Sequence, residues 1–307
     1  MIHLIQRHKN KLLALTPVLL IVLIALGAVY ILGLDKRRVL TQNISQEERL
    51  IRIPFDNIHI ESRAYLVYDK GTRTIISGKN ESSQLPLASL TKIMAALVAL
   101  DLAPRDQLIN IPTESQFNSS FDRKNLIPGK WRLDDLLRLT LISSSNSGIN
   151  TISNALSSRF VELMNQKAQK LGLNQTFFLN ESGLDINQTL SGGNGSAKDM
   201  ARLFDYALDT APDIFGSTKF DSIVINSSSG RPEEAKNTNP GVGKIDGLIA
   251  SKTGLTDLAG GNLAIAFDAA RGKRVLIVVL GSTQEGRFTD AEALANATIK
   301  YFKLKQP

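Results

Sequence analysis

The segment Leu87-Ala-Ser-Leu-Thr-Lys-Ile-Met-Ala-Ala-Leu-Val-Ala-Leu100 places a serine and a lysine at the start of an almost wholly apolar run. Such a run after Pro86 predicts a buried helix. Ser89 and Lys92 are three residues apart, close to one helical turn, so their side chains share a face. Burial disfavours an ammonium group and can lower a lysine pKa by about 3–5 units, which would make Lys92 a base for a serine nucleophile. Alone, the pattern is better explained by a helix-start serine followed by a lysine whose amine reaches solvent.

A second motif, Ser144-Ser-Asn146, lies in a polar run between two segments with helical spacing of apolar residues. The simplest interpretation of such a run is a loop with helix caps. The functional interpretation places a second hydroxyl and an amide over the nucleophile, where they could relay a proton and hold a peptide.

A third motif, Lys252-Thr-Gly254, opens the last pair of predicted strands. Glycine lets a backbone approach a ligand closely, and Lys252 with Thr253 offers a cation and a hydroxyl to a carboxylate. The tripeptide is also common in turns. The three motifs together, in this order and on a helix start, a helix junction and an edge strand, are typical of penicillin-binding proteins and class A β-lactamases.

The rest of the chain predicts strands at both ends and helices between them. Residues 64–68 and 73–77 read as a β-hairpin around a glycine turn, and residues 262–269 and 274–281 as a second strand pair. Helical spacing recurs at 133–141, 160–171 and 200–208, the last after an N-capping Ser196, and a closing helix is predicted over 291–302. This order indicates an α+β fold.

Composition excludes several classes of function. The formal net charge is +7, but residues 1–40 hold six basic residues against Asp35, so only +2 remains for the other residues and a nucleic-acid surface is not expected. The chain has no cysteine, which removes thiolate chemistry and Cys-based zinc sites. The three histidines are His3, His8 and His59, so a histidine base and a metal site are not expected.

Residues Leu12–Leu34 are uncharged and long enough to cross a bilayer, for which about 20 apolar residues suffice. They predict a retained N-terminal transmembrane helix; a cleaved signal peptide would have a shorter apolar core. We therefore divide the chain into a cytoplasmic tip and anchor (1–34), a tether (35–60) and a catalytic domain (61–307). The expected location is the bacterial cell membrane, with the catalytic domain on the extracytoplasmic side.

The chain resembles the low-molecular-weight D-alanyl-D-alanine carboxypeptidases, the S11 peptidases, over roughly residues 60–303. Besides the three motifs, the resemblance rests on the following segments: Ala64–Asp69, Leu87–Met94, Leu171–Leu184, Ser196–Arg202, and Val278–Gly281 followed by Gly286-Arg287. It implies a penicillin-binding protein or serine β-lactamase-like transpeptidase fold, with an antiparallel sheet flanked by helices and a helical subdomain.

The resemblance also implies roles for the motif residues. Ser89 would attack the bond between the two terminal D-alanines of a peptidoglycan stem peptide and form an acyl-enzyme. Neutral Lys92 would take its proton, Ser144 would pass a proton to the leaving amine, and Asn146 would bind the substrate backbone. β-Lactams would be covalent inhibitors, and no cofactor would be needed.

The substrate-binding residues implied by the same resemblance are Lys252, Thr253, Gly254, Leu255 and Arg287. Lys252 would add positive potential that keeps Lys92 neutral, and the N–H groups of Ser89 and Leu255 would form an oxyanion hole. Thr253 and Arg287 would bind the terminal carboxylate.

One local departure from the family is Ser147-Gly148, where Asp-Ala is frequent after the second motif. Three alternatives use the same fold: a D,D-endopeptidase that cuts cross-links, a β-lactamase, and a non-catalytic wall-binding module. The β-lactamase is disfavoured because residues 150–200 contain no Glu-x-x-Leu-Asn-type loop, and the wall-binding module because the motif residues are intact.

Overall fold

An antiparallel sheet of five strands, in the order β10-β11-β12-β1-β2, forms the centre of the protein. We describe it in a computed structural model, in which residues 54–112 and 128–305 are described. The strands of this sheet are β1 (Ala64–Asp69), β2 (Thr74–Lys79), β10 (Leu248–Thr256), β11 (Gly260–Ala270) and β12 (Lys273–Ser282). The two predicted hairpins are therefore confirmed, and β10, which carries the third motif, is an edge strand of the sheet.

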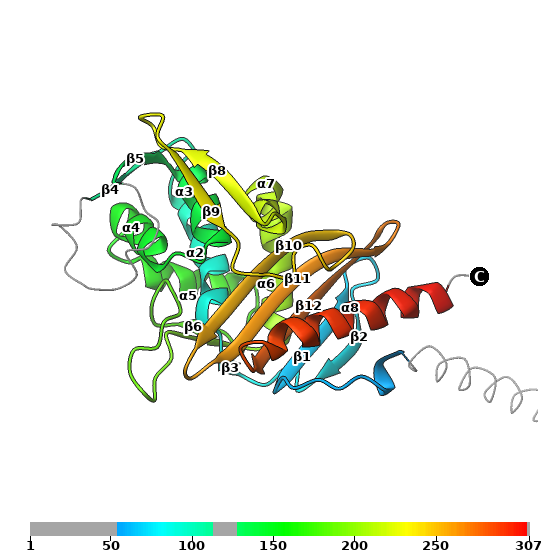
Figure 1. Cartoon of the computed structure of the whole chain (residues 1–307). Helices are drawn as coiled ribbons and strands as arrows, with labels where there is room; N and C mark the ends of the chain where they lie inside the picture. Colours follow the sequence, from blue (N-terminus) through cyan, green and yellow to red (C-terminus); the bar gives the residue numbers. More distant parts are fainter. Residues whose placement is uncertain (1–53, 113–127, 306–307) are drawn as a thin grey trace, which may run out of the picture. The chain divides into compact units, whose positions relative to one another are not determined.

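The middle of the sheet is apolar on both faces because helices cover both. In β12, the run from Val275 to Leu280 is fully buried, which is typical of strands with two covered faces. Helix α8 (Gly286–Leu304) lies across one face, while α6 (Ala197–Thr210) lies on the other (Figure 1). The sheet thus separates two hydrophobic cores.

The larger core includes a group of helices on the α6 side of the sheet: α2 (Thr91–Leu102), α3 (Leu133–Ile142), α4 (Asn146–Leu156), α5 (Phe160–Lys170), α6 and α7 (Pro212–Gly216). Helix α2 is buried all around, from Thr91 to Ala99, as expected of a helix without a polar face. Lys92 is the only charged side chain in that stretch, so the fold places a lysine inside an apolar core.

Short strands that the sequence did not indicate complete the fold. They are β3 (Leu85–Pro86), β4 (Leu108–Ile111), β5 (Gly129–Arg132), β6 (Phe177–Phe178), β7 (Gly193–Gly195), β8 (Ser222–Asn226) and β9 (Pro232–Lys236). Strand β3 of the β3-β7-β6 sheet directly precedes the first motif, and the β8-β9 hairpin precedes the loop that leads to β10. The α+β architecture with an antiparallel sheet and a helical region is as predicted.

Two boundaries differ from the prediction. Helix α8 begins at Gly286 instead of residue 291, which brings Arg287 into its first turn. The predicted tether ended at residue 60, but Phe55, Ile58 and Ile60 already pack on the core that α8 covers. These apolar side chains alternate with polar ones too briefly to show a period, so no sequence pattern indicated their burial.

The predicted transmembrane segment Leu12–Leu34 and the greater part of the predicted tether lie outside the described residues. Within residues 54–112 and 128–305, no helix combines the length and the apolar character that a membrane span requires.

Candidate active site

Ser89 lies in a short 3-10 turn, Ala88–Leu90, directly before helix α2. Ala88 has a φ of +47°, which is uncommon for a residue with a Cβ and costs about 1–3 kcal/mol. The turn aims the serine hydroxyl at the first turn of α2. As a result, Lys92 Nζ lies 2.8 Å from Ser89 Oγ, the geometry that the first motif predicted.

Lys92 is completely buried and its amine donates to neutral oxygen atoms. Besides Ser89 Oγ, it donates to Asn146 Oδ1 at 2.7 Å and to the carbonyl oxygen of Ser182 at 2.9 Å. The Asn146 contact joins the first and second motifs across 54 residues of sequence. The contact with Ser182 was not expected, because no local pattern marks a backbone carbonyl as a partner of a distant lysine.

The second motif is the junction between α3 and α4. Ser145 caps α4, its Oγ accepting from the backbone N–H of Gly148 at 3.0 Å, and Asn146 is the first residue of that helix. Ser144 has a φ of +56°. Its hydroxyl lies 2.7 Å from Lys252 Nζ, so the third motif meets the second.

Lys252 is buried, and this lowers its pKa well below the usual value for lysine. Loss of hydration is the largest cause, followed by the positive charges of Lys92 and Arg287. Its amine donates to Ser144 Oγ and, at 2.9 Å, to the carbonyl oxygen of Thr253. The two motif lysines are therefore close enough for the charge of Lys92 to act on Lys252.

Strand β10 passes directly beside the nucleophile turn. A Cβ added to Gly254 would lie 2.9 Å from the carbonyl oxygen of Leu87 and 3.2 Å from the backbone nitrogen of Ser89. Only glycine allows this approach without a shift of the backbone. The next residue, Leu255, is 43% exposed. The predicted oxyanion donors, the N–H groups of Ser89 and Leu255, thus belong to two adjacent segments.

Thr253 and Arg287 both lie next to Gly254: Thr253 precedes it in β10, and Arg287 is hydrogen-bonded to it. Thr253 Oγ1 shares a hydrogen bond of 2.5 Å with Thr238 Oγ1, and Arg287 Nη1 donates to the carbonyl oxygen of Gly254 at 2.6 Å. Burial lowers the pKa of Arg287, and the carboxylate of Glu285 partly offsets this. Arg287 also stacks on Phe288, with Cζ 4.5 Å from the ring centroid.

The departure at Gly148 has a local explanation. A Cβ on Gly148 would lie 2.3 Å from Thr140 Oγ1, so the Thr140 side chain occupies the space that an alanine would need. The two residues form a matched pair between α3 and α4.

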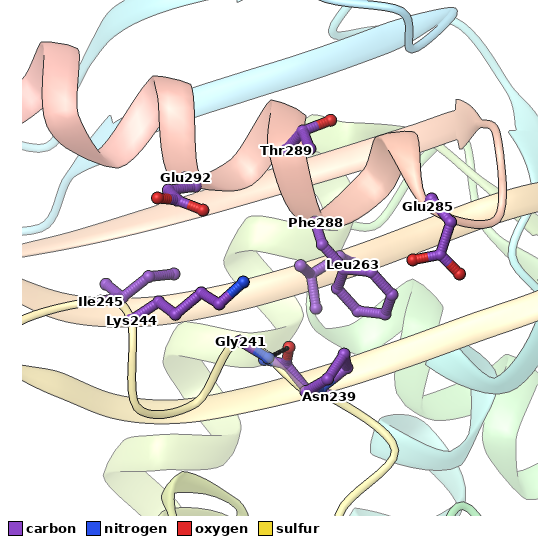
Figure 2. A pocket seen from close by; sticks show the side chains of 10 residues that line it. Asn239, Gly241, Lys244, Ile245, Leu263, Glu285, Phe288, Thr289 and Glu292 are labelled. Carbon is purple, nitrogen blue, oxygen red and sulfur yellow. Dashed lines mark hydrogen bonds between the residues drawn. The ribbon is translucent and has the colours of Figure 1, made fainter.

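A separate cavity of about 140 Å³ lies between the loop before β10 and helix α8. Figure 2 shows its lining, which includes Lys244, Phe288 and Glu292. None of the predicted site residues lines it. Among the described residues, no cluster of three or more His, Asp or Glu side chains is placed to hold a metal ion.

The structure brings together every residue that the three motifs predicted. It adds the Ser182 carbonyl and Thr238, and it adds Asp185, whose carboxylate binds the turn after β10. The nucleophilic serine beside a buried lysine, and the second serine beside a second lysine, define the class of serine acyl-transfer enzymes to which penicillin-binding proteins belong.

Comparison with known proteins places the chain within that class. The family model of peptidase S11, D-alanyl-D-alanine carboxypeptidase, matches residues 52–284. The D-alanyl-D-alanine endopeptidase of Pseudomonas aeruginosa is 27% identical over 242 residues, which cover 76% of each protein. The carboxypeptidase DacC of Escherichia coli is 27% identical over 267 residues, 81% of this chain and 64% of DacC.

Among solved structures, the cefotaxime-bound penicillin-binding protein D2 of Listeria monocytogenes has a TM-score of 0.66 and 27% sequence identity. The match covers 79% of this chain and 98% of that one. The chain belongs to the D-alanyl-D-alanine carboxypeptidase family, peptidase S11.

Proposed function

We propose that this protein is a serine-type D-alanyl-D-alanine carboxypeptidase that removes the terminal D-alanine from peptidoglycan stem peptides. The observation that carries the proposal is the distance of 2.8 Å between Nζ of the fully buried Lys92 and Oγ of Ser89, which is itself partly exposed. A hydroxyl beside a buried amine is an activated nucleophile. Family membership supplies the substrate class.

In the proposed acylation, Ser89 Oγ attacks the carbonyl carbon of the penultimate D-alanine, and unprotonated Lys92 takes the hydroxyl proton. The N–H groups of Ser89 and Leu255 stabilise the resulting oxyanion, a contribution worth about 10²–10³ in rate for each donor. The carbon–nitrogen bond then breaks. The leaving D-alanine amine takes a proton relayed through Ser144, which Lys252 holds at 2.7 Å. Water later hydrolyses the ester and regenerates Ser89.

Recognition of the C-terminal carboxylate is assigned to Thr253, Lys252 and Arg287. These residues supply a hydroxyl and positive potential next to Gly254. A free carboxylate is the feature that separates a stem-peptide end from the interior of a peptide, so a cationic pocket at this point favours carboxypeptidase activity.

Labelling of the full chain with a fluorescent penicillin tests the proposal. We expect stoichiometric covalent labelling of the wild-type protein, complete loss in Ser89→Ala, and unchanged labelling in Ser83→Ala, an exposed serine six residues upstream. Labelling that persists in Ser89→Ala, or a folded wild-type protein that takes no label, would contradict it. The second outcome would favour a non-catalytic wall-binding module.

A D,D-endopeptidase is the second candidate, and the similarity to the Pseudomonas aeruginosa endopeptidase supports it as strongly as DacC supports the first. The two activities share the same acylation chemistry and differ in the size of the leaving group beyond the scissile bond. Release of free D-alanine from a stem pentapeptide, compared with cleavage of a cross-linked muropeptide dimer, separates them. Faster cleavage of the dimer would favour the endopeptidase.

We also propose that Leu12–Leu34 anchors the protein in the bacterial cell membrane with the catalytic part on the extracytoplasmic side. Its uncharged length supports this, as does a wall substrate. The full chain should sediment with membranes and resist extraction by salt or alkali. A chain lacking residues 1–34 should be recovered in the soluble fraction.

A further inference from the structure

The segment from Asn180 to Asp185 contacts both halves of the site, and its first contact is with the nucleophile turn. The Ser182 carbonyl oxygen accepts from Lys92 Nζ at 2.9 Å. Gly183 has a φ of +79°, and a Cβ there would lie only 1.9 Å from the carbonyl oxygen of Ala88. The segment is therefore packed tightly against the turn that holds Ser89.

The second contact of this segment is with the turn after β10. The Asp185 carboxylate accepts from Thr256 Oγ1 and from the backbone N–H of Leu258, each at 3.0 Å. Thr256 Oγ1 in turn accepts from the N–H of Ala259 at 3.2 Å. One carboxylate thus fixes the turn immediately after Leu255, the second oxyanion donor of the proposed mechanism.

Asp185 acts from a segment with its own internal support. Asn180 Oδ1 accepts from the N–H of Gly183 at 2.7 Å, and Asn180 Nδ2 donates to the carbonyl oxygen of Leu184 at 2.9 Å. The packing beside Ser89 therefore sets the position of the carboxylate, and the carboxylate sets the position of the β10 turn. The segment works as a spacer between the nucleophile and the end of β10.

We propose that Asp185 is a positioning residue that sets the distance between the Leu255 N–H and Ser89, and so the geometry of the oxyanion hole. This inference rests on the proposed acyl-transfer function. Without its contacts the end of β10 is free to move by tenths of an ångström or more, and a displacement near 1 Å can cost about 10²-fold in rate. Substrate binding depends less on this geometry, because the oxygen of the scissile carbonyl carries no full charge before the attack.

The test compares Asp185→Ala with Asp257→Ala in the full chain. Asp257 is an exposed carboxylate in the same turn that makes no side-chain hydrogen bond among the described residues. We expect the acylation rate constant for a fluorescent penicillin to fall about 10- to 100-fold in Asp185→Ala and to stay at the wild-type value in Asp257→Ala. For a stem pentapeptide, kcat should fall with little change in KM.

The affinity for a peptide boronate is a second measurement, and it should not change if Asp185 only stabilises the fold. The boronate forms a tetrahedral adduct with the serine and places an oxygen in the oxyanion hole. Its affinity should fall in parallel with the acylation rate in Asp185→Ala. Thr256→Val removes the same hydrogen bond from the other side, so the double variant should lose less than the product of the two single losses.

Parallel loss of acylation rate and boronate affinity, with a thermal midpoint close to wild type, supports the inference. If Asp185→Ala keeps the wild-type acylation rate and the wild-type boronate affinity, the positioning role is wrong and the proposed function still stands. If Asp185→Ala does not fold, the acylation rate and the boronate affinity are measured in Asp185→Asn and Thr256→Val instead, and the same outcomes support or overturn the inference. A wild-type protein that is not acylated overturns the proposed function and this inference together.

Discussion

The pKa of Lys252 shows how burial of a single residue changes the chemistry of the site. Its amine is fully desolvated and lies near Lys92 and Arg287, so the folded protein holds its pKa well below that of an unfolded lysine. The cost of burying the ammonium is fully present below the folded-state pKa. It disappears as the pH rises from that value toward about 10.5, because the unfolded chain then binds the extra proton.

This gives a prediction at the residue scale for Lys252→Met. We expect the free energy of unfolding of the variant, relative to wild type, to be most favourable at low pH and to decline as the pH rises above the lowered pKa of Lys252 toward that of an unfolded lysine. Denaturant unfolding at several pH values measures it. The exposed Lys236→Met is the control and should show no such trend. A relative stability of Lys252→Met that is constant with pH would contradict the assigned shift.

At the scale of elements, strand β10 packs closely against the nucleophile turn. Gly254→Ala would drive a Cβ against backbone atoms of Leu87 and Ser89, so the strand or the turn must shift. We expect acylation by penicillin to slow by about 10- to 100-fold. Gly243→Ala, in a loop where a Cβ meets no atom within 4 Å, should leave the rate unchanged. Equal rates in the two variants would show that the strand can yield without cost.

The elements that sequence reasoning found are the ones with a clear period or a recognisable cap. Helices α3, α5 and α6 follow the apolar spacing, and Ser196 caps α6 as predicted by accepting from the N–H of Asp199 at 3.1 Å. The strands β3 to β9 have five residues or fewer, too few to establish an alternation. The start of α8 was missed because Gly286 lowers the local helix propensity. The structure shows why glycine stands there: a Cβ would collide with the side chains of Thr283 and Glu61.

For the site, the three motifs predicted the residues that meet but not the contacts that hold them. Ser89 and Lys92 are close in sequence, so helical geometry gives their distance. Thr238 and Asp185 reach β10 through loops, and their contacts span 15 and 71 residues. No periodicity connects such positions, so only the folded chain reveals them.

At the scale of the whole catalytic unit, one buried carboxylate joins three distant parts of the chain. Asp290 in α8 is 2% exposed. It accepts from the N–H groups of Glu61 and Ser62 and from Ser282 Oγ, each at 2.9 Å. The segment before β1, the end of β12 and α8 are therefore fixed to one another on the face of the sheet opposite the larger core.

We expect Asp290→Ala to lower the free energy of unfolding by about 3 kcal/mol, because buried donors lose a charged acceptor. Chemical denaturation measures the loss, and Asp246→Ala, an exposed loop carboxylate, is the control. The acylation rate of the folded fraction should stay near wild type, since the hydrogen bonds of the Asp290 carboxylate go to Glu61, Ser62 and Ser282 and not to a motif residue. A variant as stable as wild type would contradict this role.

The positive φ angles of Ala88 and Ser144 also have an evolutionary consequence. A residue with a Cβ in this region costs about 1–3 kcal/mol, more than the roughly 0.5–1 kcal/mol of chain entropy that glycine would add. Selection of random variants for heat tolerance alone should therefore enrich glycine at position 88 early. At position 144 the same change would remove a hydroxyl, so populations selected for survival at high temperature and populations selected for intact cell walls should diverge at this codon.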